Sequence, residues 1–275
     1  MPENAPFGAY APHGMTARIL TATRAASDSW LKKRLAFLLR RIAVRALRGH
    51  PVDIETFGAR MRLFPYNNLC ERRVLFTPQF FDPQERAILG ERLRENFIFI
   101  DVGANIGAYS LFVAAHGKPG TRILSVEPQP EIFDRLVFNI RLNPGMSIKA
   151  VDCAVADRPG ELTLFLDPGN SGQSSVKIVG SGLAKPIKVP ATTLQALIEA
   201  ENYTHVDALK LDVEGAADII LEPFFRDVDP ALYPRLLIVE DAADRWQIDL
   251  PGLLEAQGYR QIARSRLNRV YERDA

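Results

Sequence analysis

The sequence predicts an α/β fold, with a mostly parallel sheet that ends in an antiparallel hairpin. From about residue 96 onward, apolar runs of strand length alternate with helical patterns, an arrangement that builds a parallel sheet. The last two strand-like runs, GYRQIA and NRVYER, are separated by only a few residues, which favours an antiparallel pair. With 275 residues, 47% of them apolar, the chain is long enough for one large domain with an appendage.

Composition divides the chain into three segments. We expect an N-terminal extension with a basic amphipathic helix over residues 1–50, a small strand and helix lead-in over 51–95, and the main domain over 96–275. Residues 1–50 hold nine Lys and Arg against two Asp and Glu, whereas the rest of the chain holds 25 against 31. The formal net charge of +1 argues against a protein that binds polyanions with its whole surface.

The extension is predicted to contain one clear helix. Its first thirty or so residues are rich in Ala, Pro, Gly and Thr without a period, which predicts loose order. Between Ser29 and Gly49, which can cap the two ends, leucines recur at helical spacing and no acidic residue occurs. This helix, Trp30–Arg48, can lie on an anionic membrane surface. Alternatively, its leucine stripe docks on the main domain or on a second subunit of a homodimer, and nucleic acid is a third alternative.

The order of the remaining elements follows from the periodicity. Residues 51–80 are predicted to form short strands and turns, and Asp82 followed by Pro83 predicts a helix that runs to about Glu95. The main domain then contains the strands FIFIDV, RILSVE, SIKAVDCAV, ELTLFL, VDALKLD and LLIVE, with helices that begin near Ile106, Pro130, Thr193 and Gly215.

Several classes of protein are disfavoured. No apolar run approaches the roughly 18 to 20 residues of a membrane-spanning helix, and the N-terminus lacks the basic-then-apolar order of a secretory signal, so we expect a cytoplasmic location, with peripheral membrane contact as the alternative. The two cysteines, Cys70 and Cys153, have no nearby partners that suggest a zinc cluster or a disulfide framework.

A glycine loop follows the first strand of the main domain. The strand ends in Asp101 and runs into Gly103 and Gly107, where a doubly wound sheet binds its nucleotide. The spacing differs from the dinucleotide fingerprint, and Asp101 would repel a diphosphate. A cofactor with an ammonium and a sulfonium but no phosphate, S-adenosylmethionine, suits the loop better. Glu127 ends the second strand, where an acid can accept hydrogen bonds from both ribose hydroxyls.

Four segments, DVGANIGAYSLFVA, VEPQPEIFDRLVFNIRLN, CAVAD and LKLDVEGA, resemble the FkbM methyltransferase family over roughly Phe97 to Glu240. The resemblance implies a Rossmann-like class I methyltransferase fold, with a mostly parallel seven-stranded sheet, and transfer of a methyl group onto oxygens of polyketides, sugars and related products. It also implies site residues: Asp101, Gly103, Asn105 and Gly107 at the methionine part of the cofactor, Glu127 at the ribose and Asp157 near the adenine.

Two positions depart from the family pattern. The motif after the fourth strand has Ala217 where a second acid is usual, with Asp218 one place later, and Glu240 is followed by Asp241 rather than an aromatic residue or histidine. Both departures lie near the expected acceptor pocket, so they affect the substrate more than the cofactor.

The catalytic residues are expected at the end of VDALKLDVEG. Period-two alternation places Lys210 and Asp212 on one face of the strand, with Glu214 at its end. We expect Asp212 to be the base that takes the proton of an alcohol acceptor, Glu214 to shape the acceptor site and Lys210 to pair with one of them. Alternatively, Lys210, Asp212 and Glu214 form an ion-pair network that has no catalytic role. The acidic residues could bind Mg²⁺ if they converged, but no spacing compels a metal site, and none is predicted.

The acceptor is expected to be a small molecule or a glycan and not nucleic acid. Gly169–Ser175 has the polar side chains of a substrate lid, or is a surface connection. An RNA methyltransferase is the first alternative, since the glycine loop followed by EP and a later LN also resembles some tRNA-modifying enzymes; the net acidic main domain argues against it. The second alternative is a non-catalytic, membrane-associated module of the same fold.

Overall fold

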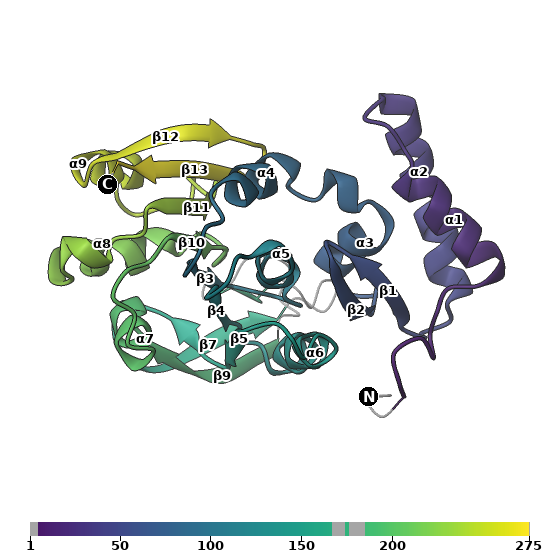
Figure 1. The fold of residues 1–275 in the computed structure, drawn as a ribbon, viewed down its shortest axis with the longest axis horizontal. Coiled ribbons are helices and arrows are strands. Elements are labelled where there is room, and N and C mark those ends of the chain that lie inside the picture. The colour runs from purple at the N-terminus through teal and green to yellow at the C-terminus, as the bar shows by residue number, and fades with distance from the viewer. Residues whose placement is uncertain (1–4, 167–173, 176–184, 275) are drawn as a thin grey trace.

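The computed structural model describes residues 5–166, 174–175 and 185–274. At its centre is a seven-stranded sheet in the order β12-β13-β11-β10-β3-β4-β5 (Figure 1). Its strands are β3 (Ile98–Val102), β4 (Arg122–Val126), β5 (Ile148–Val151), β10 (Ala208–Leu211), β11 (Leu236–Glu240), β12 (Tyr259–Arg264) and β13 (Asn268–Arg273). The first five in chain order are parallel to one another, whereas β13 is antiparallel to both β11 and β12. The predicted mostly parallel sheet with a closing hairpin is confirmed.

Helices cover both faces of the sheet. They are α5 (Ala108–His116), α6 (Pro130–Arg141), α7 (Leu194–Ala200), α8 (Ala217–Asp227) and α9 (Leu250–Ala256). Because side chains alternate along a strand, Phe99 and Ile238 pack in one core with α5, whereas Ile100 and Leu237 pack in the other with α7 and α8. Both faces of the central strands are therefore buried.

A second, four-stranded sheet has the order β6-β9-β7-β8. It consists of β6 (Ala154–Val155), β7 (Gly160–Leu166), β8 (Ser174–Ser175) and β9 (Lys185–Thr192). The run SIKAVDCAV, predicted as one strand, is divided between β5 of the central sheet and β6 of this one. Strand β9 was not predicted, since Pro186 and Pro190 within it are typical of residues that interrupt strands.

The prediction of loose order for the first thirty residues is wrong for the part described. Two helices, α1 (Gly14–Arg24) and α2 (Trp30–Ala46), pack against each other at the side of the molecule away from the hairpin (Figure 1). Ile19 and Leu20 of α1 are buried in the main core, and the Arg24 side chain donates from Nε to the Leu75 carbonyl oxygen at 2.9 Å. These few apolar residues lie on one face of α1. In a segment rich in Ala, Pro and Thr they are too few to give a clear helical period, so the helix was not predicted.

The lead-in contains more helix than predicted. A hairpin of β1 (Val52–Thr56) and β2 (Ala59–Leu63) is followed by α3 (Leu69–Phe76), the short 3-10 helix η1 (Pro78–Phe80) and α4 (Pro83–Glu91). The apolar run at the end of α3 has the pattern of a strand, but it is helical in the structure. The Asn68 side chain caps this helix by accepting from the Glu71 amide at 3.2 Å. Helix α4 ends four residues before the predicted Glu95, and Asp82 does not cap it with its side chain.

A buried ion pair fixes the start of the described chain to the lead-in. Arg62 Nε lies 2.7 Å from Asp53 Oδ1, and both side chains are 1% exposed. Asp53 also accepts from the amides of Gly8, at 2.8 Å, and Tyr10, at 3.1 Å. Burial alone would raise the pKa of Asp53, but these hydrogen bonds outweigh burial and hold the pKa below its usual range.

Removal of this buried charge is expected to destabilise the protein. We expect Asp53→Asn to lower the free energy of unfolding by about 3–5 kcal/mol, because Arg62 would remain buried without its carboxylate. Glu55→Gln is the matched control, since Glu55 pairs with Arg60 at 3.2 Å on the same hairpin but is 68% exposed, and it should cost less than about 1 kcal/mol. Urea unfolding of the two variants measures the difference; equal losses would contradict the expectation.

Over the described residues, no helix combines the length and the apolar character that crossing a membrane requires.

Candidate functional site

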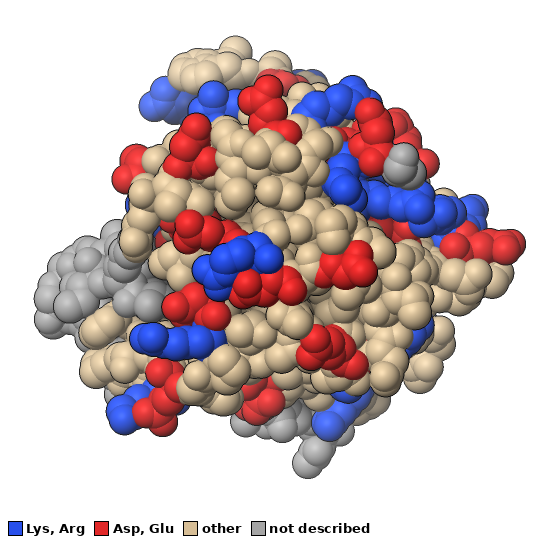
Figure 2. Space-filling view, turned by 90° about the vertical axis from the view of Figure 1, so that its left-hand side faces the viewer, with Lys and Arg blue, Asp and Glu red and all other residues tan. Residues whose placement is uncertain are grey.

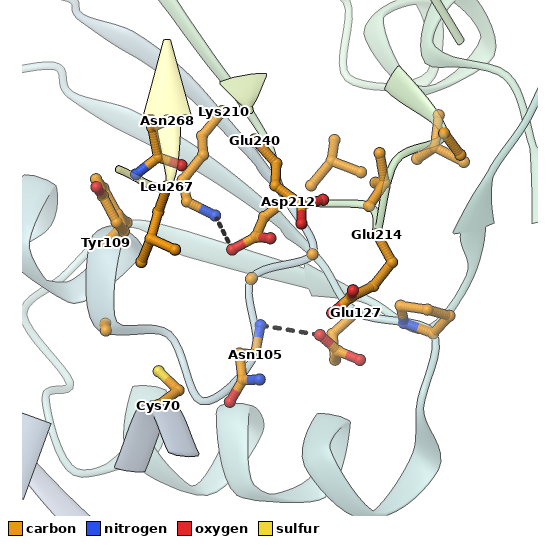
Figure 3. A pocket seen from close by; sticks show the side chains of 18 of the residues that line it. Cys70, Asn105, Tyr109, Glu127, Lys210, Asp212, Glu214, Glu240, Leu267 and Asn268 are labelled. Carbon is orange, nitrogen blue, oxygen red and sulfur yellow. Dashed lines mark hydrogen bonds and ion pairs between the residues drawn. The ribbon is translucent and has the colours of Figure 1, made fainter. Parts of the chain in front are cut away.

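The central sheet has a topological switch point between β3 and β10. From β3 the chain moves to β4 and β5 on one side, and from β10 it moves to β11 on the other. Ligands of such sheets bind in the crevice beyond the carboxyl ends of the strands at this point. A cavity of about 250 Å³ lies there, lined by the loops that follow β3, β4, β10 and β11 and by parts of the lead-in, the second sheet and the hairpin (Figure 3).

Gly103 allows the loops after β3 and β10 to touch. Its φ is +73°, in the left-handed region, and its amide donates to the Val126 carbonyl oxygen at 2.9 Å. A Cβ atom at this position would lie only 2.0 Å from the Asp212 carbonyl oxygen. Glycine is therefore required both by the backbone conformation and by the approach of the neighbouring strand end.

Glu127 is a buried carboxylate at the wall of the cavity. Its Oε2 accepts from the Asn105 amide at 2.9 Å (Figure 3), and its Oε1 accepts from the Gln129 amide at 3.0 Å. Its exposed fraction is 5%, and burial raises its pKa to about 7 despite these two donors. Each carboxylate oxygen has a further lone pair, so the pair of oxygens can accept two more hydrogen bonds from a ligand in the cavity.

The lead-in forms one wall of the cavity, which the sequence analysis did not predict. Asn68 Nδ2, at the start of α3, donates to Asn105 Oδ1 at 2.9 Å and so connects the lead-in to the glycine loop. Cys70, Arg73 and Asp82 line the cavity behind this contact. No motif marks these residues, although the capping pattern of Asn68 could have revealed the helix.

Lys210 connects two carboxylates beneath the cavity. Its Nζ lies 3.1 Å from Asp212 Oδ2 and 3.8 Å from Asp101 Oδ1, and 5.1 Å from the centre of the Tyr109 ring. Burial alone would lower the pKa of Lys210, but Asp212 and Asp101 outweigh burial and raise it above its usual range. Lys210 therefore stays charged at neutral pH and serves as a counterion, not as a base.

A second group of charges borders the other side of Asp212. Arg245 NH2 lies 2.7 Å from Glu240 Oε1, and Arg245 NH1 lies 3.4 Å from Glu214 Oε2. The Glu240 carboxylate also accepts from the Gly215 amide at 2.9 Å. Burial, together with the charges of Glu240 and Asp212, raises the pKa of Glu214 to about 7. Arg245 belongs to no motif and was not among the predicted site residues.

The predicted site residues do not all reach the cavity. It is lined by Gly103, Asn105, Glu127, Lys210, Asp212 and Glu214, but not by Asp101, Gly107 or Asp157. The Asp101 side chain points behind the loop and accepts from Ser110 Oγ at 2.7 Å. Gly107, with φ +88°, lies against Leu136 of α6, where a Cβ would be 2.7 Å from Leu136 Cδ1.

The two departures from the family pattern are engaged in structural contacts. Asp218 accepts from the Gln247 amide at 2.6 Å, and Asp241 pairs with Arg264 and Arg269 of the hairpin, each at 2.8 Å. Of the predicted lid, residues 169–173 lie outside the described residues. Within the described part of the chain, no group of three or more His, Cys, Asp or Glu side chains is placed to hold a metal ion.

Comparison with known proteins gives a family match and distant relatives. Residues 101–260 match the model of the methyltransferase FkbM domain. The methyltransferase sdnD of Sordaria araneosa is 36% identical over 85 residues, which are 30% of this chain and 32% of that protein. The hexuronic acid methyltransferase AglP of Haloferax volcanii is 27% identical over 129 residues, 46% of this chain and 50% of that protein. The matched segments thus span about a third and about half of the length of these two curated relatives.

Two solved structures are similar at low identity. The methyltransferase FkbM from Methylobacillus flagellatus is 16% identical, with 86% of this chain and 60% of that chain covered and a TM-score of 0.43. TYW2 from M. jannaschii, solved in complex with AdoMet, is 12% identical, with 82% and 88% covered and a TM-score of 0.42.

Proposed function

The chain belongs to the methyltransferase FkbM domain family, and we propose that it transfers a methyl group from S-adenosylmethionine to a hydroxyl oxygen of a small molecule or glycan. The observation that carries this proposal is the cavity at the switch point. Glu127 and the glycine loop line it together with Asp212 and Glu214. The same cavity thus offers acceptors for the hydroxyls of an adenosyl group and a carboxylate for an alcohol.

The residues of the glycine loop fit the cofactor. The free lone pairs of Glu127 can accept from the two ribose hydroxyls, and Gly103 lets the loop lie against the end of β10, where any side chain would clash. The carboxylates of Glu127 and Asp212 would repel a diphosphate in the same place. When bound, the cofactor supplies a methyl group on a positively charged sulfur.

The chain's own residues position the acceptor and take its proton. Asp212 is 47% exposed and lines the cavity, so a hydroxyl group can reach its carboxylate. Lys210 holds that carboxylate in place, and the proton of the acceptor hydroxyl passes to Asp212 as the new bond forms. Glu214, held by Arg245, shapes the acceptor side. Orientation of the acceptor opposite the leaving sulfur accounts for roughly 7 to 11 kcal/mol of barrier lowering in such reactions.

The charge distribution on the face shown in Figure 2 does not support RNA binding. This face is the left-hand side of the molecule in Figure 1, and acidic and basic side chains are interspersed on it. A basic stripe, the usual mark of nucleic-acid binding, does not run across it.

Cofactor binding is expected to weaken on acidification. Because the pKa of Glu127 is about 7, lowering the pH from about 8 to about 6 protonates it and removes an acceptor of the ribose hydroxyls. We expect Glu127→Gln to bind S-adenosylmethionine about 10- to 100-fold more weakly than the wild type at pH 8 and with little pH dependence, since a hydrogen bond to a charged group contributes roughly 1.5–3 kcal/mol. Isothermal titration calorimetry measures both effects.

The control for this experiment is Glu95→Gln, which changes an exposed glutamate that does not line the cavity and should leave the affinity unaltered. Transfer of a labelled methyl group to a panel of hydroxylated metabolites and glycans then tests the reaction itself. If the wild type bound a diphosphate nucleotide and not S-adenosylmethionine, the proposed function would be wrong.

A further inference from the structure

The apolar side chains that the fold leaves exposed gather on one helix. Six of the nine large apolar side chains that are exposed in the described residues lie on α2. They are Trp30 (67%), Leu31 (71%), Leu35 (54%), Phe37 (48%), Leu38 (56%) and Ile42 (42%). Scattered exposed apolar residues are ordinary on a protein surface, whereas a contiguous group marks a surface that binds something.

The helix has two apolar faces, and only one of them is used inside the molecule. Ala36 and Ala43 are buried, and Leu39 packs beside them where α2 meets α1. Leu31, Leu35, Leu38 and Ile42 are spaced by four, three and four residues, so they form a separate stripe along the helix. These four side chains are exposed, so this stripe does not dock on the main domain in the structure; a second subunit or a membrane surface remains to be tested.

Basic side chains run beside the exposed stripe. Arg34, Arg41 and Arg45 recur at intervals of seven and four, which places them next to Leu38 and Ile42, and all three are exposed. Arg34 also stacks on Trp30, with its guanidinium 5.3 Å from the ring centre. Helix α2 contains no acidic residue. The uncovered face thus combines leucines, an aromatic residue and a row of positive charges.

We propose that this face of α2 docks the protein on an anionic lipid surface. Leucine and tryptophan side chains would enter the boundary between headgroups and acyl chains, and the arginines would contact the lipid phosphates, as in helices that lie in the plane of a membrane. A second copy of the chain fits less well, because a symmetric contact would place the same face against itself and bring its arginines together. Charge complementarity therefore favours lipid over self-association.

The test uses the full-length protein and sedimentation with vesicles of phosphatidylcholine alone or with 30% phosphatidylglycerol. We expect binding to the anionic vesicles only, and release by about 0.5 M NaCl. The triple variant Arg34→Gln, Arg41→Gln, Arg45→Gln should lower the partition coefficient about 100-fold, the size expected of three basic residues near an anionic surface. Leu35→Glu with Leu38→Glu should abolish binding.

The matched control is the triple variant Arg60→Gln, Lys188→Gln, Arg226→Gln, which removes three charges that are 56%, 72% and 68% exposed elsewhere. It should bind like the wild type, and thermal unfolding should show that both sets of variants are folded. Equal binding to neutral vesicles, equal losses in the two triple variants, or no vesicle binding by the wild type would each overturn the proposal. The proposal would also be overturned if sedimentation velocity showed a wild-type dimer that the leucine variant dissociates, while neither the wild type nor this variant binds vesicles.

Discussion

Gly103→Ala is expected to abolish binding of S-adenosylmethionine and to lower the free energy of unfolding by roughly 2–6 kcal/mol. Two costs add in this variant. Alanine is strained at a φ of +73°, and its Cβ would lie 2.0 Å from the backbone oxygen of Asp212, which cannot rotate away as a flexible side chain can. The loops after β3 and β10 must then separate, and the floor of the cavity separates with them.

A graded series of glycine variants isolates this effect. Gly145→Ala meets no atom within 4 Å and has an ordinary φ, so it should change stability by less than about 0.5 kcal/mol. Gly107→Ala should fall between the two, because its φ is +88° but the one short contact of its Cβ would be with the tip of Leu136, which can move. Urea unfolding gives the order, and calorimetry gives the affinity. Should Gly103→Ala bind the cofactor within threefold of the wild type, the role given to this glycine would be wrong.

Asp212→Asn is expected to lower kcat by about 10²- to 10⁴-fold while leaving the affinity for S-adenosylmethionine within a factor of about three. Asparagine retains the size of the side chain but cannot take the proton of the acceptor hydroxyl. Lys210 keeps its second carboxylate, Asp101 at 3.8 Å, so the buried ammonium remains paired and the fold should persist. Single-turnover transfer of a labelled methyl group, together with calorimetry, separates the two quantities.

Glu214→Gln is the comparison that identifies the base. With Asp212 as the base, this variant should raise KM for the acceptor and keep kcat within about tenfold of the wild type, whereas Asp212→Asn should lose kcat. Glu214 is the other carboxylate at this strand end, and its raised pKa, about 7, allows it to accept a proton near neutral pH. The reverse result, with kcat lost in Glu214→Gln and kept in Asp212→Asn, would assign the base to Glu214.

The sequence predicted the sheet and the floor of the cavity because both depend on local patterns. The apolar run that ends in Asp101 and continues into Gly103 is β3 and its loop, and period-two alternation correctly placed Lys210 beside Asp212, at 3.1 Å. The same alternation also explains why Asp101 does not line the cavity. It lies on the face of β3 that packs on α5, where Ser110 meets it.

The remaining parts of the site depend on contacts between distant segments. Asn68 and Asn105 are 37 residues apart, and Arg245 is 31 residues from Glu214, so no periodicity links the members of either pair. The ordered α1 and the strand β9 were missed for a related reason. Their local composition favours coil, and tertiary packing decides their structure.

The wall that the lead-in contributes lies outside the segment that matches the family. Leu69, Cys70, Arg73, Phe81 and Asp82 line the cavity, yet they precede that segment, which begins at residue 101. Part of the surface that a bound molecule would meet is therefore encoded upstream, and substitutions there would reshape the cavity without touching the glycine loop.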